Sequence, residues 1–459
     1  MTRLLSNSVH ERDIAALLHP STNARTHLST GPQVFDHGEG IYVYDDAGNR
    51  YLEGASALWC ASLGFANERL AKVAYDAMKR LGYYQIFRHA SNEAAVSLAD
   101  RLLDIAPAPM SKVLLQCSGS EANDTALKLV WYHWNAQGKP QKRKVISRID
   151  SYHGSTIGTI CLTGIPDFHK GFGMPYEGYL YAECPHWYRD HHDGETEEQF
   201  SQRMADSLEA LILREGPETI GAFFCDPIQG GAAGALPPPA GYFERVQAIL
   251  RKYDILLVAD EVICGFGRTG NMWGSQTCGL QPDLVTCAKA LSAAMQPVSA
   301  VLISDRVFQS ILAQSDRLGS FVHGFTYGGH PVTCAVANEV LTIYEEMDLI
   351  GHVQALAPHF RATFAALTDH PLVGHYAGHG LMGGLQLVQD KATRRLFPEG
   401  REVGPIVDRL ARKHGLILRT TKHRGSLAPP LIITAEQITE MGEKLTRALD
   451  DALAELKAA

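Results

Sequence analysis

The 459-residue chain lacks any apolar run of the length that a membrane span requires. Its first residues, MTRLLSNSVHERDIAALLHP, contain no apolar core followed by a small-residue cleavage site, so we expect no signal peptide and a cytoplasmic protein. No run of basic residues stands out and the formal net charge is −8, which argues against a nucleic-acid partner. We therefore expect neither a nucleic-acid-binding nor a membrane protein.

Paired cysteine motifs are missing as well. The nine cysteines are scattered and odd in number, and none belongs to a CxxC pair. Several lie inside apolar runs, where a cysteine usually packs as a small hydrophobic residue. The pattern indicates a reduced protein without a disulfide framework, a zinc ribbon or another metal site.

Short apolar runs alternate with helical periodicity from about residue 68 to residue 330. Strands alternating with helices predict an α/β fold, in which helices cover both faces of a mostly parallel sheet. The expected strands are Lys112–Cys117, Lys144–Ile149, Ile220–Cys225, Ile255–Ala259, Leu284–Cys287 and Ser299–Ile303.

The two ends of the chain follow different patterns. Two short alternating runs around a turn predict a hairpin over Gly40–Leu52. After Pro331 we expect a helix over Val332–Met347, a glycine-rich run, short strands and a C-terminal helix. We divide the chain into an N-terminal segment of a small α+β domain (1–58), a large domain (59–330) and the C-terminal part of the small domain (331–459).

Two of the expected strands end in charged residues. Asp260 follows the run Ile255–Ala259, and Lys289 follows the next run along the chain. Ligands collect at the carboxyl ends of strands in parallel sheets, so we expect these side chains to share a pocket. A buried lysine loses its proton readily and forms Schiff bases, and a carboxylate facing a pyridinium nitrogen is the other protein group that pyridoxal phosphate (PLP) needs. The alternative is a solvated lysine at a strand end.

The stretch Gly265–Gly270 matches the pattern GxGxxG and follows a strand. A dinucleotide fingerprint must open a helix whose N-terminus holds the pyrophosphate. Here an acidic pair, Asp260-Glu261, stands between the strand and the glycines, and no convincing helix follows. We therefore reject a dinucleotide site.

Other expected strands are followed by residues that suit a phosphate and a flat ring. Gly119 and Ser120 lie where a strand leads into a helix, and free backbone N–H groups there could hold a phosphate; ordinary helix capping is the alternative. Tyr152 follows another strand and could cover one face of a flat cofactor, with Val262 on the other face. Core packing is the alternative for both.

Four more residues are candidates for cofactor or substrate binding. Thr326, in a loop rich in glycine and hydroxyl groups, could donate to a phosphate or belong to a flexible connection between domains. Arg419 ends an apolar run and is suited to bidentate carboxylate binding, although surface arginines are commoner. Trp59 and Phe87 could line an apolar substrate pocket or pack in the core.

In the order and spacing of its motifs, the sequence resembles the class III aminotransferases, PLP enzymes of fold type I, over nearly the whole chain. The segments that carry the resemblance are SGSEANDTALKL (118–129), YHG (152–154), DPIQG (226–230), LLVADEVICGFGRTG (256–270), PDLVTCAKALS (282–292) and HGFTYGGHP (323–331). The segments ALWC (57–60) and LRTTKH with LAPPL (418–431) are most similar to the ω-amino-acid or amine:pyruvate transaminases.

The resemblance implies a role for each candidate residue. Lys289 would be the Schiff-base lysine and proton carrier, and Asp260 would pair with the pyridinium nitrogen. A homodimer, or a tetramer, with sites at the interface would supply Thr326 to the phosphate from the partner subunit. The remaining cofactor-binding residues would be Gly119, Ser120, Tyr152, His153, Val262 and Gln229, and the substrate-binding residues Trp59, Phe87, Tyr152 and Arg419.

Several positions depart from the family pattern. Ala290 replaces a preferred glycine, and Ala293-Ala294-Met295 replaces a common Ser-Gly-aromatic stretch. Ser299 replaces a usual glycine, and Asp226 replaces a usual glutamate. Gly231 stands where ornithine and 4-aminobutyrate transaminases usually carry a glutamate, which argues against these two activities.

The resemblance implies a transaminase that moves an amino group from a primary amine or ω-amino acid to a keto acid, pyruvate, in a ping-pong scheme. Two alternatives remain: a decarboxylase or aminomutase of the same fold, and a catalytically silent PLP-binding protein. The natural donor is open among taurine, β-alanine, a polyamine and an arylalkylamine.

Overall fold

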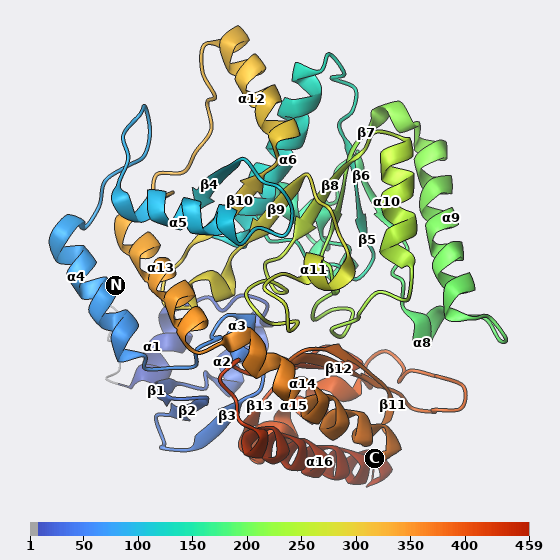
Figure 1. The fold of residues 1–459 in the computed structure, drawn as a ribbon. Coiled ribbons are helices and arrows are strands. Elements are labelled where there is room, and N and C mark those ends of the chain that lie inside the picture. The colour runs from blue at the N-terminus through green and yellow to red at the C-terminus, as the bar shows by residue number, and fades with distance from the viewer. Residues whose placement is uncertain (1–7, 459) are drawn as a thin grey trace, which may run out of the picture.

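A seven-stranded sheet forms the centre of the larger part of the molecule in the computed structural model, which describes residues 8–458 (Figure 1). Strand β10 is antiparallel to both of its neighbours, and the other pairs are parallel. In spatial order the strands are β4 (Lys112–Gln116), β10 (Ser299–Ile303), β9 (Leu284–Cys287), β8 (Leu256–Asp260), β7 (Ile220–Cys225), β5 (Lys144–Arg148) and β6 (Tyr179–Ala182). The mostly parallel α/β sheet is confirmed, and all expected strands are present.

Helices cover both faces of this sheet. On one face pack α6 (Gly119–Ala136) and α12 (Asp305–Leu318), and on the other α9 (Glu197–Glu215) and α10 (Tyr242–Lys252). Successive side chains of a strand point to opposite faces. In β7, for example, Phe224 packs with α6 while its neighbour Phe223 packs with α9 and α10. Burial on both faces is the reason that these strands read as unbroken apolar runs.

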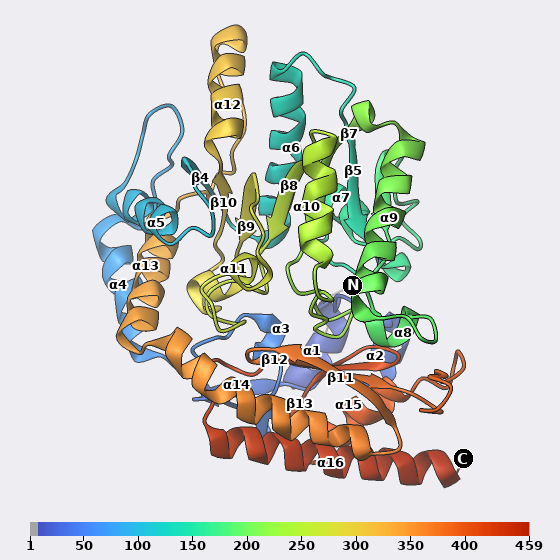
Figure 2. The same ribbon diagram turned by 45° about the vertical axis from the view of Figure 1, so that its right-hand side comes forward.

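The two chain ends meet in a smaller unit below the sheet (Figures 1 and 2). The hairpin prediction is confirmed, because β2 pairs antiparallel with β3. One sheet contains β1 (Phe35–Glu39), β2 (Tyr42–Asp45), β3 (Arg50–Glu53) and β13 (Leu416–Ile417). An antiparallel sheet contains β11 (Val373–His379), β12 (Met382–Leu387), β15 (Arg424–Leu427) and β14 (Arg419–Thr420). Because β13 joins β3, N- and C-terminal segments share one sheet.

Helices line the outside of the smaller unit and its border with the larger one. In Figure 2, α16 (Ala435–Ala458) runs along the side that faces away from the seven-stranded sheet, with α14 (Leu349–Ala365) and α15 (Val403–Lys413) nearby. The domain limit that we predict at residues 330/331 coincides with the start of α13 (Pro331–Glu346), which packs on α4 (Glu68–Leu81) and α5 (Glu93–Asp104). The domain limits stay a prediction.

The remaining elements are short. They are the helices α1 (Val9–Ala16), α2 (Ala24–Thr30), α3 (Ser56–Trp59), α7 (Ile157–Leu162), α8 (Trp187–Asp190) and α11 (Gly274–Cys278), and the 3₁₀ turns Pro166–Phe168, Pro217–Thr219, Lys289–Ser292 and Ala366–Asp369. Neither α1 nor α2 has a buried residue, and Asp13 ties them together by accepting hydrogen bonds from His19 Nε2 and His27 Nε2 at 2.9 Å. The first seven residues of the stretch in which we expect no signal peptide lie outside the described residues.

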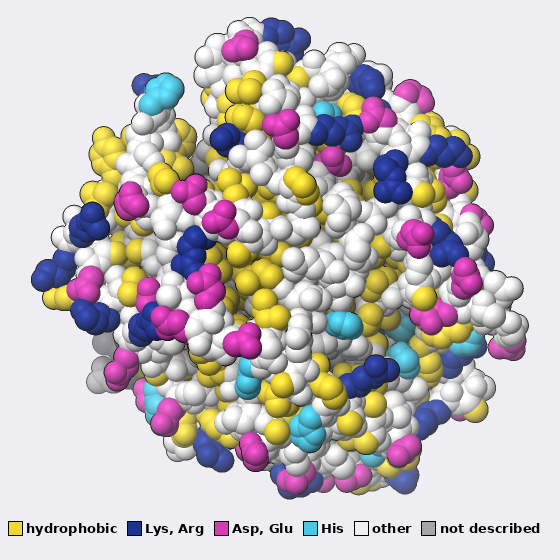
Figure 3. Space-filling model, in the orientation of Figure 1, with side chains coloured by type: hydrophobic (Ala, Val, Ile, Leu, Met, Phe, Trp, Pro, Cys, Tyr) yellow, Lys and Arg dark blue, Asp and Glu magenta, His cyan; other side chains and the backbone are white. Residues whose placement is uncertain are grey.

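Lys, Arg, Asp and Glu side chains are intermixed over the face of the molecule that Figure 3 shows. Within residues 8–458, none of the helices combines the length and the apolar character that crossing a bilayer requires.

The turn that follows β9 holds three residues other than glycine at positive φ: Lys289 (φ 48°), Ala293 (φ 49°) and Ala294 (φ 68°). This left-handed conformation brings the Cβ atom of an L-residue close to the backbone and costs about 1–2 kcal/mol per residue. Ala294 is exposed, so its methyl group offsets little of this cost by packing. The family pattern has glycine at this position, and the backbone geometry gives the reason.

We expect Ala294→Gly to raise the free energy of unfolding by about 0.5–1 kcal/mol, because relief of the left-handed strain exceeds the backbone entropy that glycine loses on folding. Equilibrium denaturation measures it. Ala290→Gly, at the neighbouring departure from the family pattern, is the matched control. Ala290 is buried and does not have a positive φ, so the same substitution there should lower stability by about 0.5–1 kcal/mol. Equal effects at the two positions would contradict the assignment of strain to Ala294.

Candidate active site

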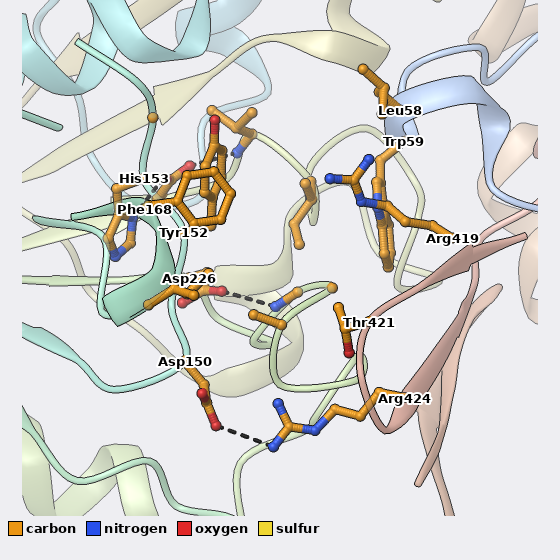
Figure 4. A pocket seen from close by; sticks show the side chains of 18 of the residues that line it. Leu58, Trp59, Asp150, Tyr152, His153, Phe168, Asp226, Arg419, Thr421 and Arg424 are labelled. Atoms are coloured by element: carbon orange, nitrogen blue, oxygen red, sulfur yellow. Dashed lines mark hydrogen bonds and ion pairs between the residues drawn. The ribbon is translucent and has the colours of Figure 1, made fainter. Parts of the chain in front are cut away.

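A cavity of about 570 Å³ lies at the carboxyl ends of the central strands, beside the smaller unit (Figure 4). Its walls come from the turns after β4, β5, β7, β8 and β9, together with α3 and the β14–β15 hairpin. The structure brings together most of the residues that the sequence singled out: Trp59, Gly119, Ser120, Tyr152, His153, Asp260, Val262, Lys289 and Arg419 all line it.

Asp260, at the end of β8, is almost completely buried and accepts three hydrogen bonds. Oδ2 accepts from Asn123 Nδ2 at 2.7 Å and from His153 Nδ1 at 2.8 Å, and Oδ1 accepts from the Val262 N–H at 3.0 Å. A buried carboxylate is costly unless it is paired and hydrogen-bonded, and all three donors stabilise its negative charge. Because a carboxylate only accepts, this contact places the proton of His153 on Nδ1.

Asn123 is one of the site residues that our sequence analysis missed. Its Oδ1 accepts from Thr286 Oγ1 at 2.8 Å, which fixes the orientation of the amide, and its Nδ2 also donates to the His153 carbonyl at 2.8 Å. Asn123 therefore joins α6, β9 and the turn after β5 around Asp260. One signal was present: an asparagine among buried residues of α6, where a polar side chain needs a partner.

Lys289 follows β9 and opens the strained turn. Burial lowers the pKa of its ammonium below the usual value, and the positive charge of Arg419 acts in the same direction, while Asp260 opposes the shift. A lysine with a lowered pKa is more often neutral, and only the neutral amine is nucleophilic.

The N-terminus of α6 forms an anion cradle. Ser118 Oγ caps this 18-residue helix by accepting from the Glu121 N–H at 3.2 Å, and Ser120 Oγ accepts from the Ser155 N–H at 3.1 Å. A Cβ atom on Gly119 would lie 3.1 Å from both methyl groups of Val262, and one on Gly154 would lie 2.6 Å from Ser120 Oγ. Larger side chains would fill this space, so glycine keeps the helix N-terminus open to an anion.

These features fit PLP. The cradle suits the phosphate, the hydrogen-bonded carboxylate of Asp260 suits the pyridinium nitrogen, and Lys289 suits the aldehyde. We expect Tyr152 and Val262 to cover opposite faces of the flat cofactor ring, and both residues line the cavity. The Tyr152 ring packs at 5.4 Å, centroid to centroid, against Phe168, and its hydroxyl lies 2.8 Å from Ser155 Oγ.

The substrate side of the cavity holds Trp59 and Arg419 (Figure 4). Trp59 is buried in the distorted helix α3, where its φ is 65°. Arg419 is exposed, and among the described residues its guanidinium makes no hydrogen bond or ion pair. This arginine is therefore free to bind a carboxylate.

Three predicted residues lie outside the cavity lining. Gln229 is buried beside it, where its Nε2 donates to the Ile149 carbonyl at 2.9 Å. Phe87 and Thr326 are exposed, and the segments that hold them are in contact: a Cβ atom on Gly324 would lie 2.8 Å from the Phe87 ring, and Tyr83 donates to the Thr326 carbonyl at 2.8 Å. Within one subunit, neither Phe87 nor Thr326 lines the cavity.

The glycine-rich stretch after β8 does not open a long helix. The next helix, α11, begins at Gly274 and has five residues. Arg268, in the middle of the stretch, is buried and donates to the carbonyls of Leu381 and Pro429. The stretch thus connects the central sheet to the smaller unit, which agrees with our rejection of a dinucleotide site.

Two of the departures from the family pattern lie in this region. Asp226 forms a buried ion pair with Arg148, with Arg148 Nη2 2.9 Å from Asp226 Oδ1, and its Oδ2 accepts from the Gly230 N–H at 3.0 Å. The aspartate therefore holds the turn after β7. Gly231 lines the cavity beside Trp59.

Comparisons with known proteins agree with this geometry. Residues 24–449 match the sequence model of the family "Aminotransferase class-III". Gamma aminobutyrate transaminase 3, chloroplastic, from Solanum lycopersicum is 45% identical over 97% of this chain and 87% of its own length. Vanillin aminotransferase from Capsicum chinense is 44% identical over 92% of both chains. The ω-transaminase from Pseudomonas jessenii in complex with PMP superimposes with a TM-score of 0.96 at 46% identity, covering 98% of this chain and 99% of that one.

We expect Lys289→Met to stabilise the cofactor-free protein at pH 7. The folded state disfavours the protonated lysine, so the wild-type protein loses free energy of unfolding at pH values below the lowered pKa. This loss fades as the pH rises toward 10.5, where the unfolded chain also loses the proton. Denaturation at pH 7 and pH 9.5 measures the gain, which should be smaller at the higher pH. Lys457→Met, at an exposed position, is the control and should show no such difference. A gain that does not depend on pH would contradict the burial of charge at Lys289.

Proposed function

The chain belongs to the class III aminotransferases, and from that premise we propose that it transfers the amino group of a primary amine or ω-amino acid to pyruvate. Amino-group transfer and the use of PLP follow from the family and from its relatives in complex with the cofactor. Pyruvate as the acceptor is our inference.

One observation carries this proposal: Lys289 and the hydrogen-bonded carboxylate of Asp260 line the same cavity as the anion cradle of α6. PLP, when bound, supplies the electron sink that stabilises a carbanion at the amine-bearing carbon. Asp260, held by donors from three directions, keeps a negative charge in place for the pyridinium nitrogen. Lys289 Nζ, whose pKa is lowered by burial, can take a proton and return it as general base and acid.

The substrate side supports a small keto acid. The free guanidinium of Arg419 offers two parallel donors to a carboxylate, and Trp59 gives an apolar wall beside it. Arg419 is exposed, so its side chain can turn toward water when an uncharged amine occupies the same cavity. This arrangement lets an amine and pyruvate use one site in turn.

Initial rates test this function. With a primary amine and pyruvate varied against each other, we expect parallel double-reciprocal lines, one alanine formed per amine consumed, and no carbon dioxide. Intersecting lines would contradict the ping-pong scheme. Release of carbon dioxide, or turnover without a keto acid, would support the decarboxylase or aminomutase alternative instead.

We also propose a homodimer in which each subunit completes the site of the other. Support comes from Phe87 and Thr326, which are exposed, lie on segments in contact with each other and do not line the cavity of their own subunit. Light scattering should give twice the chain mass of 50.2 kDa, or a multiple of it in a tetramer. An active species with the mass of one chain would contradict a site shared between subunits.

A further inference from the structure

A second arginine, Arg424 on β15, reaches the same cavity from another part of its wall (Figure 4). Its side chain is 15% exposed. Nη2 lies 3.2 Å from Asp150 Oδ2, and Nε donates to Gln386 Oε1 at 3.2 Å. Among the described residues nothing accepts a hydrogen bond from Nη1. Arg424 is therefore held in place on one side and keeps free donors on the other.

The charge of Arg424 is only partly compensated. Its sole ion-pair partner among the described residues, Asp150, also binds Arg189 Nη1 at 2.9 Å, so one carboxylate is shared by two guanidinium groups. Arg189 has a second partner, Asp190, at 2.8 Å, and does not line the cavity. Arg424 thus presents surplus positive charge to the cavity, and Asp150 limits it.

The cavity wall leaves room near this arginine. A Cβ atom on Gly231, which lines the cavity, would lie 3.7 Å from Ser426 Oγ and 3.8 Å from Trp59. These are ordinary contact distances, so a longer side chain at this position would occupy space that glycine leaves open. With glycine at 231, no carboxylate from that position can neutralise an arginine of the cavity.

We propose that Arg424 forms a second anion subsite, which receives the carboxylate or sulfonate at the far end of an amino donor, and that Asp150 tunes its strength. This inference rests on the proposed transaminase function and names its donor class. In an ω-amino acid, the anionic group is separated from the amine-bearing carbon by a chain of methylenes, whereas the carboxylate of pyruvate adjoins the reacting carbonyl. Two arginines at different places in the wall suit these two positions, with Arg419 binding the acceptor and Arg424 the donor.

The alternative role for Arg424 is structural, as a link between β15 and the turn after β5. The two roles predict opposite effects on donor binding when the charge of Asp150 is removed. If the Asp150–Arg424 pair only holds the wall together, then removal of either charge weakens the site for every donor. If Arg424 binds the donor, then neutralising Asp150 frees the guanidinium and improves binding of anionic donors alone, because Arg189 keeps its second partner.

The test compares anionic with uncharged donors on the PLP-loaded enzyme, with pyruvate as the acceptor. The probes are β-alanine and taurine, which carry a carboxylate and a sulfonate, and butylamine, which carries neither. The measured quantity is the ratio of kcat/KM for each anionic donor to kcat/KM for butylamine. Butylamine also serves as an internal control for folding and cofactor loading.

We expect Arg424→Gln to lower this ratio about 10- to 100-fold, as loss of a charge-assisted hydrogen bond does. Asp150→Asn should raise it several-fold, and Arg189→Gln should lower it, because Asp150 then neutralises Arg424 alone. Arg409→Gln, which removes a surface guanidinium outside the cavity, is the control and should leave it unchanged. The donor with the larger change identifies carboxylate or sulfonate as the preferred group. If Arg424→Gln does not fold, Asp150→Asn still distinguishes the two roles, because a structural role of the pair predicts no rise in the kcat/KM ratio.

Two results would overturn the subsite: wild type that uses butylamine but neither anionic donor, or an unchanged ratio in both Arg424→Gln and Asp150→Asn. Equal losses for all donors in both variants would assign the pair a structural role instead. Failure of wild type to transfer the amino group of any of the three donors would count against the proposed function, which separates the two hypotheses.

Discussion

The buried carboxylate of Asp260 is the constraint on which the rest of the site depends. Away from water such a charge is tolerated only when donors surround it, and the donors come from α6, from the turn after β5 and from the backbone after β8. The carboxylate therefore fixes the relative positions of these elements at the edge of the sheet. The anion cradle at the start of α6 and the strained turn of Lys289 take their places around the same point. The packing of the large domain and the geometry of the cofactor site therefore depend on the same hydrogen bonds to Asp260.

The next residue, Glu261, shows how closely that environment is controlled. It is fully buried, and burial raises the pKa of its carboxyl group to about 7, although the N–H groups of Gly274 and Ser275 act against the shift. Two adjacent acidic residues thus hold different structures. Asp260 receives two side-chain donors and one backbone donor and lines the cavity, whereas Glu261 receives backbone donors and holds the turn that leads into α11.

The sequence predicted the features that depend on local pattern. Strands such as β7 and β9 are buried on both faces and therefore read as unbroken apolar runs, and Asp260 and Lys289 are recognisable because a charge ends such a run. Strand β6 was not predicted because it is only partly buried, whereas β9, of the same length, is buried throughout. The Asp150–Arg424 pair could not be predicted, since its two residues lie 274 positions apart. The role of Asn123 was missed because its partner Asp260 lies 137 positions away, although an asparagine within an apolar helix indicates a polar partner. Phe87 and Thr326 do not line the active-site cavity within one subunit, and the cytoplasmic location stays a prediction.

The direct test of the central claim, that Lys289 and Asp260 serve one cofactor in amino-group transfer, is an absorbance spectrum of the PLP-loaded protein before and after addition of an amine without keto acid. We expect the band of the lysine-bound cofactor to fall and that of pyridoxamine phosphate to rise, with one carbonyl product per site, and pyruvate to reverse the change. The Lys289→Ala variant should bind PLP without the lysine-bound band and show no conversion. A wild-type spectrum that no amine or amino acid perturbs, or normal conversion by Lys289→Ala, would contradict the account.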